Sequence, residues 1–280
     1  MPAVRMGPMI GLSVQVVLLA ILTTTVGLGI AGLVTGVVYG FSVCAALTWG
    51  LYRVGVGNIA TPASETGGTF LKPASETVGT FATRSGETIG KFGPADWVTL
   101  TRATLIGCVA ALTADSFHRR APVDVLVAIA IAALVLDALD GQVARRTSTA
   151  SGLGARFDME CDAFLILVLS VYVARSMGAW ILAIGAMRYA FVLASWAMRW
   201  MRDPLPERFW RKVVAATQGV VLVFATADVL PAPLMLAALG AALALLVESF
   251  GRDIAWLWHR ASPRRSDQLV PGAMAPPTRG

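Results

Sequence analysis

Long apolar segments alternate with short polar connections along most of the chain. Two of them, at 9–28 and 30–52, form a pair near the N-terminus. Six more follow at 99–114, 123–139, 157–174, 179–198, 213–229 and 233–250. Their lengths are close to the roughly 20 residues that an α-helix needs to cross a bilayer. The pattern therefore predicts an all-α integral membrane protein, in which a two-helix N-terminal transmembrane hairpin precedes a six-helix core.

Glycines mark the predicted hairpin. A Gly-Leu-Gly turn at 27–29 joins its two segments, and Gly29, Gly32, Gly36 and Gly40 recur along the second one. Small residues at this spacing allow membrane helices to approach each other closely. The spacing indicates either such packing or the ordinary frequency of glycine in membrane helices.

An eleven-residue motif occurs three times between the hairpin and the core, beginning at Pro62, Pro73 and Arg84. Its Gly, Thr and Pro residues disfavour a stable helix, so we expect a flexible or surface-lying linker. The period of eleven is also compatible with a slightly unwound helix adsorbed to lipid. The expected organisation is a hairpin at 1–56, a repeat-containing linker at 57–95, the core at 96–255, and an interfacial helix with a disordered tail at 256–280.

Composition supports the membrane assignment and argues against several kinds of partner and site. Hydrophobic residues make up 56% of the chain and charged residues 14%, whereas soluble proteins have about 25% charged residues. We attribute the net charge of +6 to cytoplasmic loops and anionic lipid, and expect no nucleic-acid partner. The three cysteines are isolated and the two histidines are far apart, which argues against a disulfide framework, a thiolate metal site or a histidine-centred site.

Four aspartates stand at the facing ends of two core segments. Asp137 and Asp140 are spaced i, i+3, and Asp158 and Asp162 are spaced i, i+4, so each pair shares one face of a helix. The glycine-containing linker between the pairs can fold back and bring them together. Either pair alone is also typical of a solvated helix end. Carboxylates near a bilayer are functional candidates by default, and a cluster of them suits a hard cation such as Mg²⁺ or Mn²⁺.

The sequence around these aspartates follows the pattern D-x2-D-G-x2-A-R-x8-G-x3-D-x3-D without departure. The remaining fixed positions are Gly141, Ala144, Arg145 and Gly154. This pattern resembles the signature of the class I CDP-alcohol phosphatidyltransferases, integral membrane enzymes of phospholipid synthesis. Eight identities at fixed spacing seldom coincide by chance. The resemblance implies that the six-helix core is a CDP-alcohol phosphotransferase core.

A second stretch is similar to the opening segment of the same family, commonly Pro-Asn-x-x-Thr-x-x-Arg. Asp96 stands where Asn is usual, and Thr99 and Arg102 follow at the family's spacing. In the family this segment lies near the nucleotide. The alternative is that Asp96 caps the start of an interfacial helix.

The chemistry of a CDP-linked donor assigns roles to the aspartates. Two Mg²⁺ or Mn²⁺ ions can clamp a diphosphate, and we assign Asp137, Asp140 and Asp158 as their ligands. One carboxylate has to take the proton from the attacking hydroxyl group. The resemblance implies that this catalytic base is Asp162, which also touches the second metal.

The residues between the aspartates are candidates for the nucleotide site. Gly141 and Gly154 allow close approach of cytidine or phosphate, because neither has a side chain. Ala144 leaves space for the nucleotide, and Arg145 can hold a phosphate in bidentate fashion. Ser151 falls where the family often has a small hydroxyl residue near the donor.

Three basic residues are candidates for the acceptor site. Arg188 lies inside an apolar segment, where an unpaired cation is costly, so it either binds an anionic acceptor or pairs with a motif aspartate. Arg211 and Lys212 open the next segment and can bind a phosphate on the acceptor. The alternative for this pair is the ordinary positive charge of a cytoplasmic loop.

Positive charge sets the expected orientation. Arg145 and Arg156 flank the aspartates, and they share one predicted side of the membrane with Arg211, Lys212 and the Arg-rich tail. By the positive-inside rule that side is cytoplasmic, although the basic residues at 118–120 lie on the other side. We therefore expect a multi-pass protein of the cell (inner) membrane whose active site opens at the cytoplasmic face.

The leading functional hypothesis is transfer of a phosphatidyl group from CDP-diacylglycerol to a polar alcohol acceptor, with release of CMP. The motif fits equally an enzyme that joins CDP-choline or CDP-ethanolamine to diacylglycerol, because it recognises the CDP part. A different class is a cation or proton transporter that uses the aspartates as its path, but transporters tend to place such charges at mid-membrane. The family resemblance also implies a homodimer.

Overall fold

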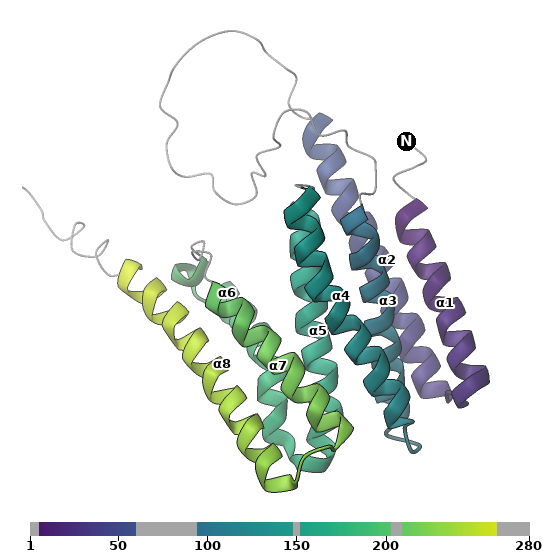
Figure 1. The fold of residues 1–280 in the computed structure, drawn as a ribbon. Coiled ribbons are helices and arrows are strands. Elements are labelled where there is room, and N and C mark those ends of the chain that lie inside the picture. Colours follow the sequence, from purple (N-terminus) through teal and green to yellow (C-terminus); the bar gives the residue numbers. More distant parts are fainter. Residues whose placement is uncertain (1–5, 60–93, 148–151, 203–208, 262–280) are drawn as a thin grey trace, which may run out of the picture. The chain divides into compact units, whose positions relative to one another are not determined.

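The computed structural model describes residues 6–59, 94–147, 152–202 and 209–261, and all the regular structure in these ranges is helical. The repeats of the expected linker and the C-terminal tail lie outside the described residues. The helices, labelled in Figure 1, are α1 (Met6–Val26), α2 (Ile30–Ile59), α3 (Pro94–Asp115), α4 (Val123–Thr147), α5 (Gly152–Met177), α6 (Leu182–Ala197), α7 (Phe209–Ala227) and α8 (Ala232–Ala261). Short 3-10 helices, η2 (Ala179–Ile181) and η3 (Arg199–Arg202), flank α6. The predicted all-α membrane fold is confirmed. Each predicted segment corresponds to one α-helix, but the segments at 9–28 and 213–229 run two residues beyond α1 and α7, and the segment at 179–198 also includes η2.

Five helical stretches in the described residues are long and apolar enough to cross a membrane: α1, α2, α3, η2 together with α6 (Ala179–Ala197), and α8. The remaining three helices carry charged residues that interrupt or shorten their apolar stretches, namely Asp137 in α4, Asp158, Glu160 and Asp162 in α5, and Arg211 and Lys212 in α7. Helix α8 continues without a break through Ala261, so Trp256 and Trp258 extend the last helix of the core.

The helices divide into two compact units, Met1–Leu165 and Ile166–Gly280, whose boundary falls within α5. In the first unit α3 is the central helix, because α1, α2 and α4 all pack against it. Of the apolar stretch of α3, 72% is buried, whereas the corresponding stretches of α1 and α2 are mostly exposed. An exposed apolar surface on the outer helices is what a lipid environment accommodates.

Glycines of α2 lie at close contacts inside the first unit. A Cβ atom built on Gly32 would lie 2.7 Å from the Ala111 carbonyl oxygen of α3, and one on Gly36 would lie 2.6 Å from Leu19 of α1. Both distances are shorter than real Cβ contacts. A side chain at Gly32 would meet a backbone atom and force the helices apart, whereas one at Gly36 would require the flexible Leu19 side chain to move. The close-packing interpretation of the glycine spacing is therefore confirmed, and the packing occurs within one chain.

The turn of the hairpin is fixed to the end of α3. Gly27 has a φ of 72°, in the left-handed region that glycine adopts readily. The Gly29 amide N–H donates to Oδ1 of Asp115 over 3.1 Å, and Nη1 of Arg119 donates to the Gly27 carbonyl oxygen over 2.8 Å. These bonds satisfy backbone groups at the helix ends and hold the hairpin against α3.

The second unit is built on α7 and α8, which pack along each other. The buried Gln218 of α7 donates through Nε2 to the Ala242 carbonyl oxygen of α8 over 2.7 Å. Aromatic pairs, Phe191 with Phe250 and Trp200 with Trp258, connect α6 and η3 to α8, with ring centroids 5.4 Å apart in each pair. Gln218 is thus a packing residue between two helices of this unit.

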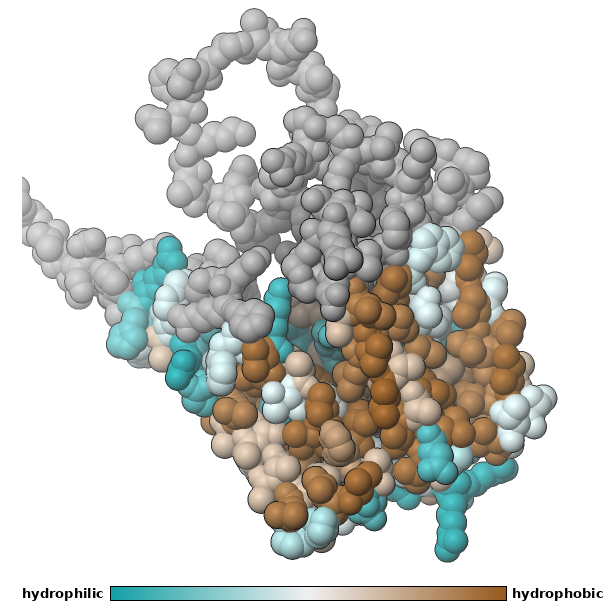
Figure 2. Space-filling view, viewed as in Figure 1, coloured by the Kyte–Doolittle hydropathy of each residue, from teal (hydrophilic) through white to brown (hydrophobic). Residues whose placement is uncertain are grey.

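The visible surface of the helices is largely apolar (Figure 2). On α1 the exposed residues include Val14, Val17 and Ile21, and on α2 they include Val38 and Phe41. Soluble proteins rarely expose contiguous apolar patches of such extent. Together with the long apolar helices, this surface identifies a multi-pass membrane protein.

Candidate active site and metal centre

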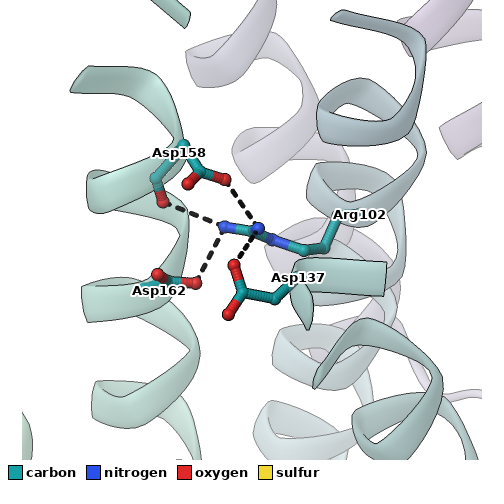
Figure 3. Close-up of polar contacts among 4 residues, drawn as sticks. All are labelled: Arg102, Asp137, Asp158 and Asp162. Carbon is teal, nitrogen blue, oxygen red and sulfur yellow. Dashed lines mark hydrogen bonds and ion pairs between the residues drawn. The ribbon is translucent and has the colours of Figure 1, made fainter. Parts of the chain in front are cut away.

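The first unit gathers one arginine and three aspartates from three helices. Arg102 extends from α3 toward Asp137 of α4 and toward Asp158 and Asp162 of α5, as Figure 3 shows. Its Nη1 lies 2.6 Å from Oδ1 of Asp137 and 2.6 Å from Oδ1 of Asp158. Its Nη2 lies 2.8 Å from Oδ1 of Asp162 and also donates to the Asp158 carbonyl oxygen over 3.0 Å.

Helical periodicity explains how the aspartates converge. Asp158 and Asp162 are four residues apart on α5, so their side chains emerge on the same face one turn apart. Asp137 belongs to α4, which packs against α3. The predicted convergence of the two aspartate-bearing helices is therefore observed for these three residues.

Burial differs sharply between the cation and the anions of this cluster. The side chain of Arg102 is 0% exposed, whereas those of Asp137, Asp158 and Asp162 are 37%, 34% and 34% exposed. An arginine cannot release its proton inside a protein, so its charge has to be compensated by anions. The three carboxylates compensate it from one side and remain accessible on the other.

The same three carboxylates fit a divalent metal ion. One oxygen atom from each of Asp137, Asp158 and Asp162 can be chosen so that all three lie within 4.8 Å of one another. Carboxylate oxygens are the ligands that Mg²⁺ and Mn²⁺ prefer, and their partial exposure leaves room for the substrate phosphates and waters that complete such sites. Charge, donor type and spacing are thus appropriate for a hard cation.

The other motif residues are placed by their helices. Asp140 lies one turn beyond Asp137 on α4, and Gly141, Ala144 and Arg145 follow on the same helix. Gly154 lies in the first turn of α5. Their side-chain environments lie outside the described part of the chain, as does Ser151 altogether. The roles predicted for these residues remain predictions.

The predicted acceptor residues all belong to the second unit. Arg188 is half-buried on α6, and Lys212 is exposed at the start of α7. Arg211 lies beside it, with its Nε 3.4 Å from Oδ2 of the buried Asp253 on α8. Arg211 therefore has an ion-pair partner on a neighbouring helix of the same unit, and the acceptor roles of all three residues stay predictions.

Sequence reasoning assigned Arg102 only to the neighbourhood of the nucleotide and missed its contact with the aspartates. The available signal was its position inside an apolar segment, where an isolated cation is costly and a partner is expected. The same cost applies to Arg102 as to Arg188, because both residues lie inside apolar segments. Its partners could not be named, because they lie 35, 56 and 60 residues away in the sequence.

A carboxylate cluster of this kind in a helical membrane protein is appropriate for an enzyme that acts on phosphate-containing substrates with divalent cations. The family model for CDP-alcohol phosphatidyltransferase matches residues 93–247, which is more than half of the chain. The chain is a member of the CDP-alcohol phosphatidyltransferase family. The family transfers a phosphatidyl group from a CDP-alcohol to an acceptor and depends on divalent metal. A search of curated proteins found no significant match, and a search of solved structures found none either.

Proposed function

We propose that this protein transfers the phosphatidyl group of CDP-diacylglycerol to a small polar alcohol and releases CMP. The observation that supports the proposal most strongly is the convergence of Asp137, Asp158 and Asp162, within an intact family motif, at one partly exposed position of a membrane protein. The reaction breaks the bond between the phosphatidyl phosphorus and the bridging oxygen that leaves with CMP. A new bond forms between that phosphorus and the alcohol oxygen, whose proton is removed.

The aspartates would hold the metal ions that this reaction needs. In the proposal Asp137, Asp140 and Asp158 bind two Mg²⁺ or Mn²⁺ ions, and Asp162 contacts the second. When bound, the divalent ions would neutralise the negative charge of the diphosphate and the charge that develops on the leaving oxygen. The contribution of the chain itself is to fix the carboxylates in space before the substrate arrives, which lowers the reorganisation cost of the reaction.

Asp162 is the proposed catalytic base. It lies on the same helix face as Asp158, one turn further into the helix, and its carboxylate is 34% exposed. An exposed carboxylate oxygen can accept the proton of an alcohol that approaches the phosphorus in line. Gly141, Ala144, Arg145, Ser151 and Gly154 are the proposed contacts of the cytidine and phosphate groups.

The acceptor is proposed to be held by basic residues, with Arg188 as the first candidate and Arg211 and Lys212 as further ones. Arg188 is supported by its position in the apolar stretch Ala179–Ala197, formed by η2 and α6, which is long enough to span the membrane. The site is proposed to open at the cytoplasmic face of the cell membrane, and the protein to form a homodimer. Light scattering of the purified protein in detergent would give the oligomeric state, and accessibility labelling of introduced cysteines would give the orientation.

The decisive experiment measures CMP release by the purified full-length protein in detergent with Mg²⁺. CDP-diacylglycerol is offered with a panel of alcohols that includes glycerol phosphate, inositol phosphate, serine and inositol. Asp162→Asn is the inactive control. Glu160→Gln is the matched control, because Glu160 is an exposed acidic residue on the same helix that we assign no catalytic role.

Each result has a clear consequence. If one alcohol drives CMP release, and the activity is lost in Asp162→Asn but kept in Glu160→Gln, the proposal is supported and the head group is identified. If only CDP-choline or CDP-ethanolamine with diacylglycerol reacts, donor and acceptor roles are reversed. If no CDP compound is bound or consumed, the proposal fails and cation transport is the next activity to test.

A further inference from the structure

Arg102 contacts the three carboxylates with two different nitrogen atoms, and all of these contacts are with Oδ1 atoms. The guanidinium reaches them from the buried side of the cluster, since its own exposure is zero while each carboxylate is about one-third exposed. A single fixed cation therefore neutralises part of the charge of the predicted metal ligands from within the protein.

The size of this effect follows from charge and distance. Three carboxylates and one guanidinium carry a net charge of −2 (three negative charges and one positive), against −3 for the carboxylates alone. At a separation of about 4 Å near a protein surface, two unit charges interact by more than the free energy of a tenfold change in affinity. A factor of ten in affinity needs only about 1.4 kcal/mol. Even a heavily screened Arg102 is thus strong enough to shift metal affinity measurably.

We propose that Arg102 is an internal counter-cation that gathers the aspartates and at the same time lowers their affinity for divalent metal ions. The inference rests on the metal role that the proposed function gives to these aspartates. Its consequence is that the metal ions bind firmly only when a further negative group, such as the diphosphate of the donor, enters the site. Arg102 would then couple metal binding to substrate binding, which makes it a positioning residue for the reaction.

The test is a titration of the full-length protein in detergent with Mn²⁺ alone, without any CDP compound. The free ion is quantified by its electron paramagnetic resonance spectrum. Arg102→Gln removes the charge and keeps hydrogen-bonding capacity, whereas Arg102→Lys keeps the charge but not the fork of donors. Arg119→Gln is the control, because Arg119 follows the other end of α3 and binds the Gly27 carbonyl oxygen.

Arg102→Gln is expected to bind Mn²⁺ about tenfold more tightly than the wild type, because the metal no longer meets a fixed positive charge. Arg102→Lys is expected to stay within about twofold of the wild type, since its charge is unchanged. Arg119→Gln should leave the Mn²⁺ affinity unchanged. In EDTA, Arg102→Gln should melt at a lower temperature than the wild type, and Mn²⁺ should raise its melting temperature more than that of the wild type.

A purely structural role would destabilise both Arg102 variants without tightening metal binding. Equal or weaker Mn²⁺ binding by Arg102→Gln would therefore overturn the inference while leaving the proposed function intact. If Arg102→Gln cannot be purified even in Mn²⁺, the test relies on Arg102→Lys. A large loss of Mn²⁺ affinity in Arg102→Lys would overturn the inference, because it would show that the geometry of the guanidinium donors and not the charge controls metal binding. If Mn²⁺ binds neither the wild type nor the Arg102 variants, the metal role fails and the inference fails with it.

Discussion

Helix α3 takes part in two junctions that are built in opposite ways. Toward the hairpin it packs through small residues, and glycines of α2 and α3 let side chains of the neighbouring helices come close. Toward α4 and α5 it extends one buried arginine into three carboxylates. The first junction depends on shape, and the second depends on balanced charge. A divalent cation can alter only the charged junction. We therefore propose that the charged junction serves the reaction and that the close-packed junction with the hairpin stabilises the fold.

The largest expected effect comes from breaking the charged junction at Asp162. Asp162→Asn keeps an oxygen acceptor for Arg102 but removes the proposed base, so CMP release should fall by about 10² to 10⁴-fold. That loss corresponds to roughly 3 to 5 kcal/mol in the activation barrier. The measurement is the initial rate of CMP release with Mg²⁺, together with the melting temperature. An active Asp162→Asn variant would remove Asp162 from the base role.

The next effect is expected at the shape-based junction. A Cβ atom on Gly107 of α3 would lie 2.5 Å from Nε2 of Gln15 and 2.6 Å from the ring of Tyr39. Gly107→Ala should therefore destabilise the protein by about 1 to 3 kcal/mol, as overpacking of a core does. Thermal unfolding in detergent measures this, while Mn²⁺ affinity should stay unchanged.

Gly240→Ala is the matched control for Gly107→Ala. Gly240 lies inside α8, and nothing would lie within 4 Å of an added Cβ atom. Alanine favours a helix over glycine by about 1 kcal/mol, so this variant should be as stable as the wild type or more so. Equal destabilisation by both substitutions would contradict the view that close contact at Gly107 holds the hairpin to α3.

A smaller effect is expected at the anchor of the hairpin turn. Asp115→Ala leaves the buried Gly29 N–H without its side-chain acceptor and should cost about 1 to 2 kcal/mol. Asp115→Asn retains an oxygen that can accept this hydrogen bond and should recover most of the loss. The comparison is made by chemical or thermal unfolding, and a similar loss in both variants would show that the negative charge, not the hydrogen bond, is important.

The two junctions also differ in how far the sequence predicts them. The pairing of Asp137 with Asp158 and Asp162 follows from local rules, because helical periodicity and a short linker bring them together. The role of Arg102 does not, since its partners are distant in sequence and depend on how α3 packs. The same holds for Gly107, whose neighbours Gln15 and Tyr39 lie on the hairpin. The hydropathy pattern predicts where the helices lie. It does not predict which helices pack against each other, because that depends on how side chains distant in sequence fit together.

The smallest expected effect would refine the description of the hairpin junction. Gln15 is 2% exposed on α1, and within the described residues neither polar atom of its amide has a hydrogen-bond partner. It lies beside a cavity of about 10 Å³ that is also lined by Tyr39, Cys44 and Thr104. A buried amide without partners is costly, and an apolar side chain of similar shape removes that cost. Gln15→Met should therefore leave the free energy of unfolding unchanged or raise it by up to about 1 kcal/mol, which would appear as an equal or slightly higher melting temperature.

A loss of stability in Gln15→Met would instead give information about the contents of this cavity. A clear loss of stability would show that the amide is satisfied by a buried water, for which a cavity of this size is just large enough. The hairpin junction would then contain a polar contact as well as close packing. Gln15→Glu separates the two cases further, because a buried carboxylate without a cation beside it should be strongly destabilising here. At the aspartate junction the carboxylates do not meet this penalty, because each is about one-third exposed and lies beside Arg102.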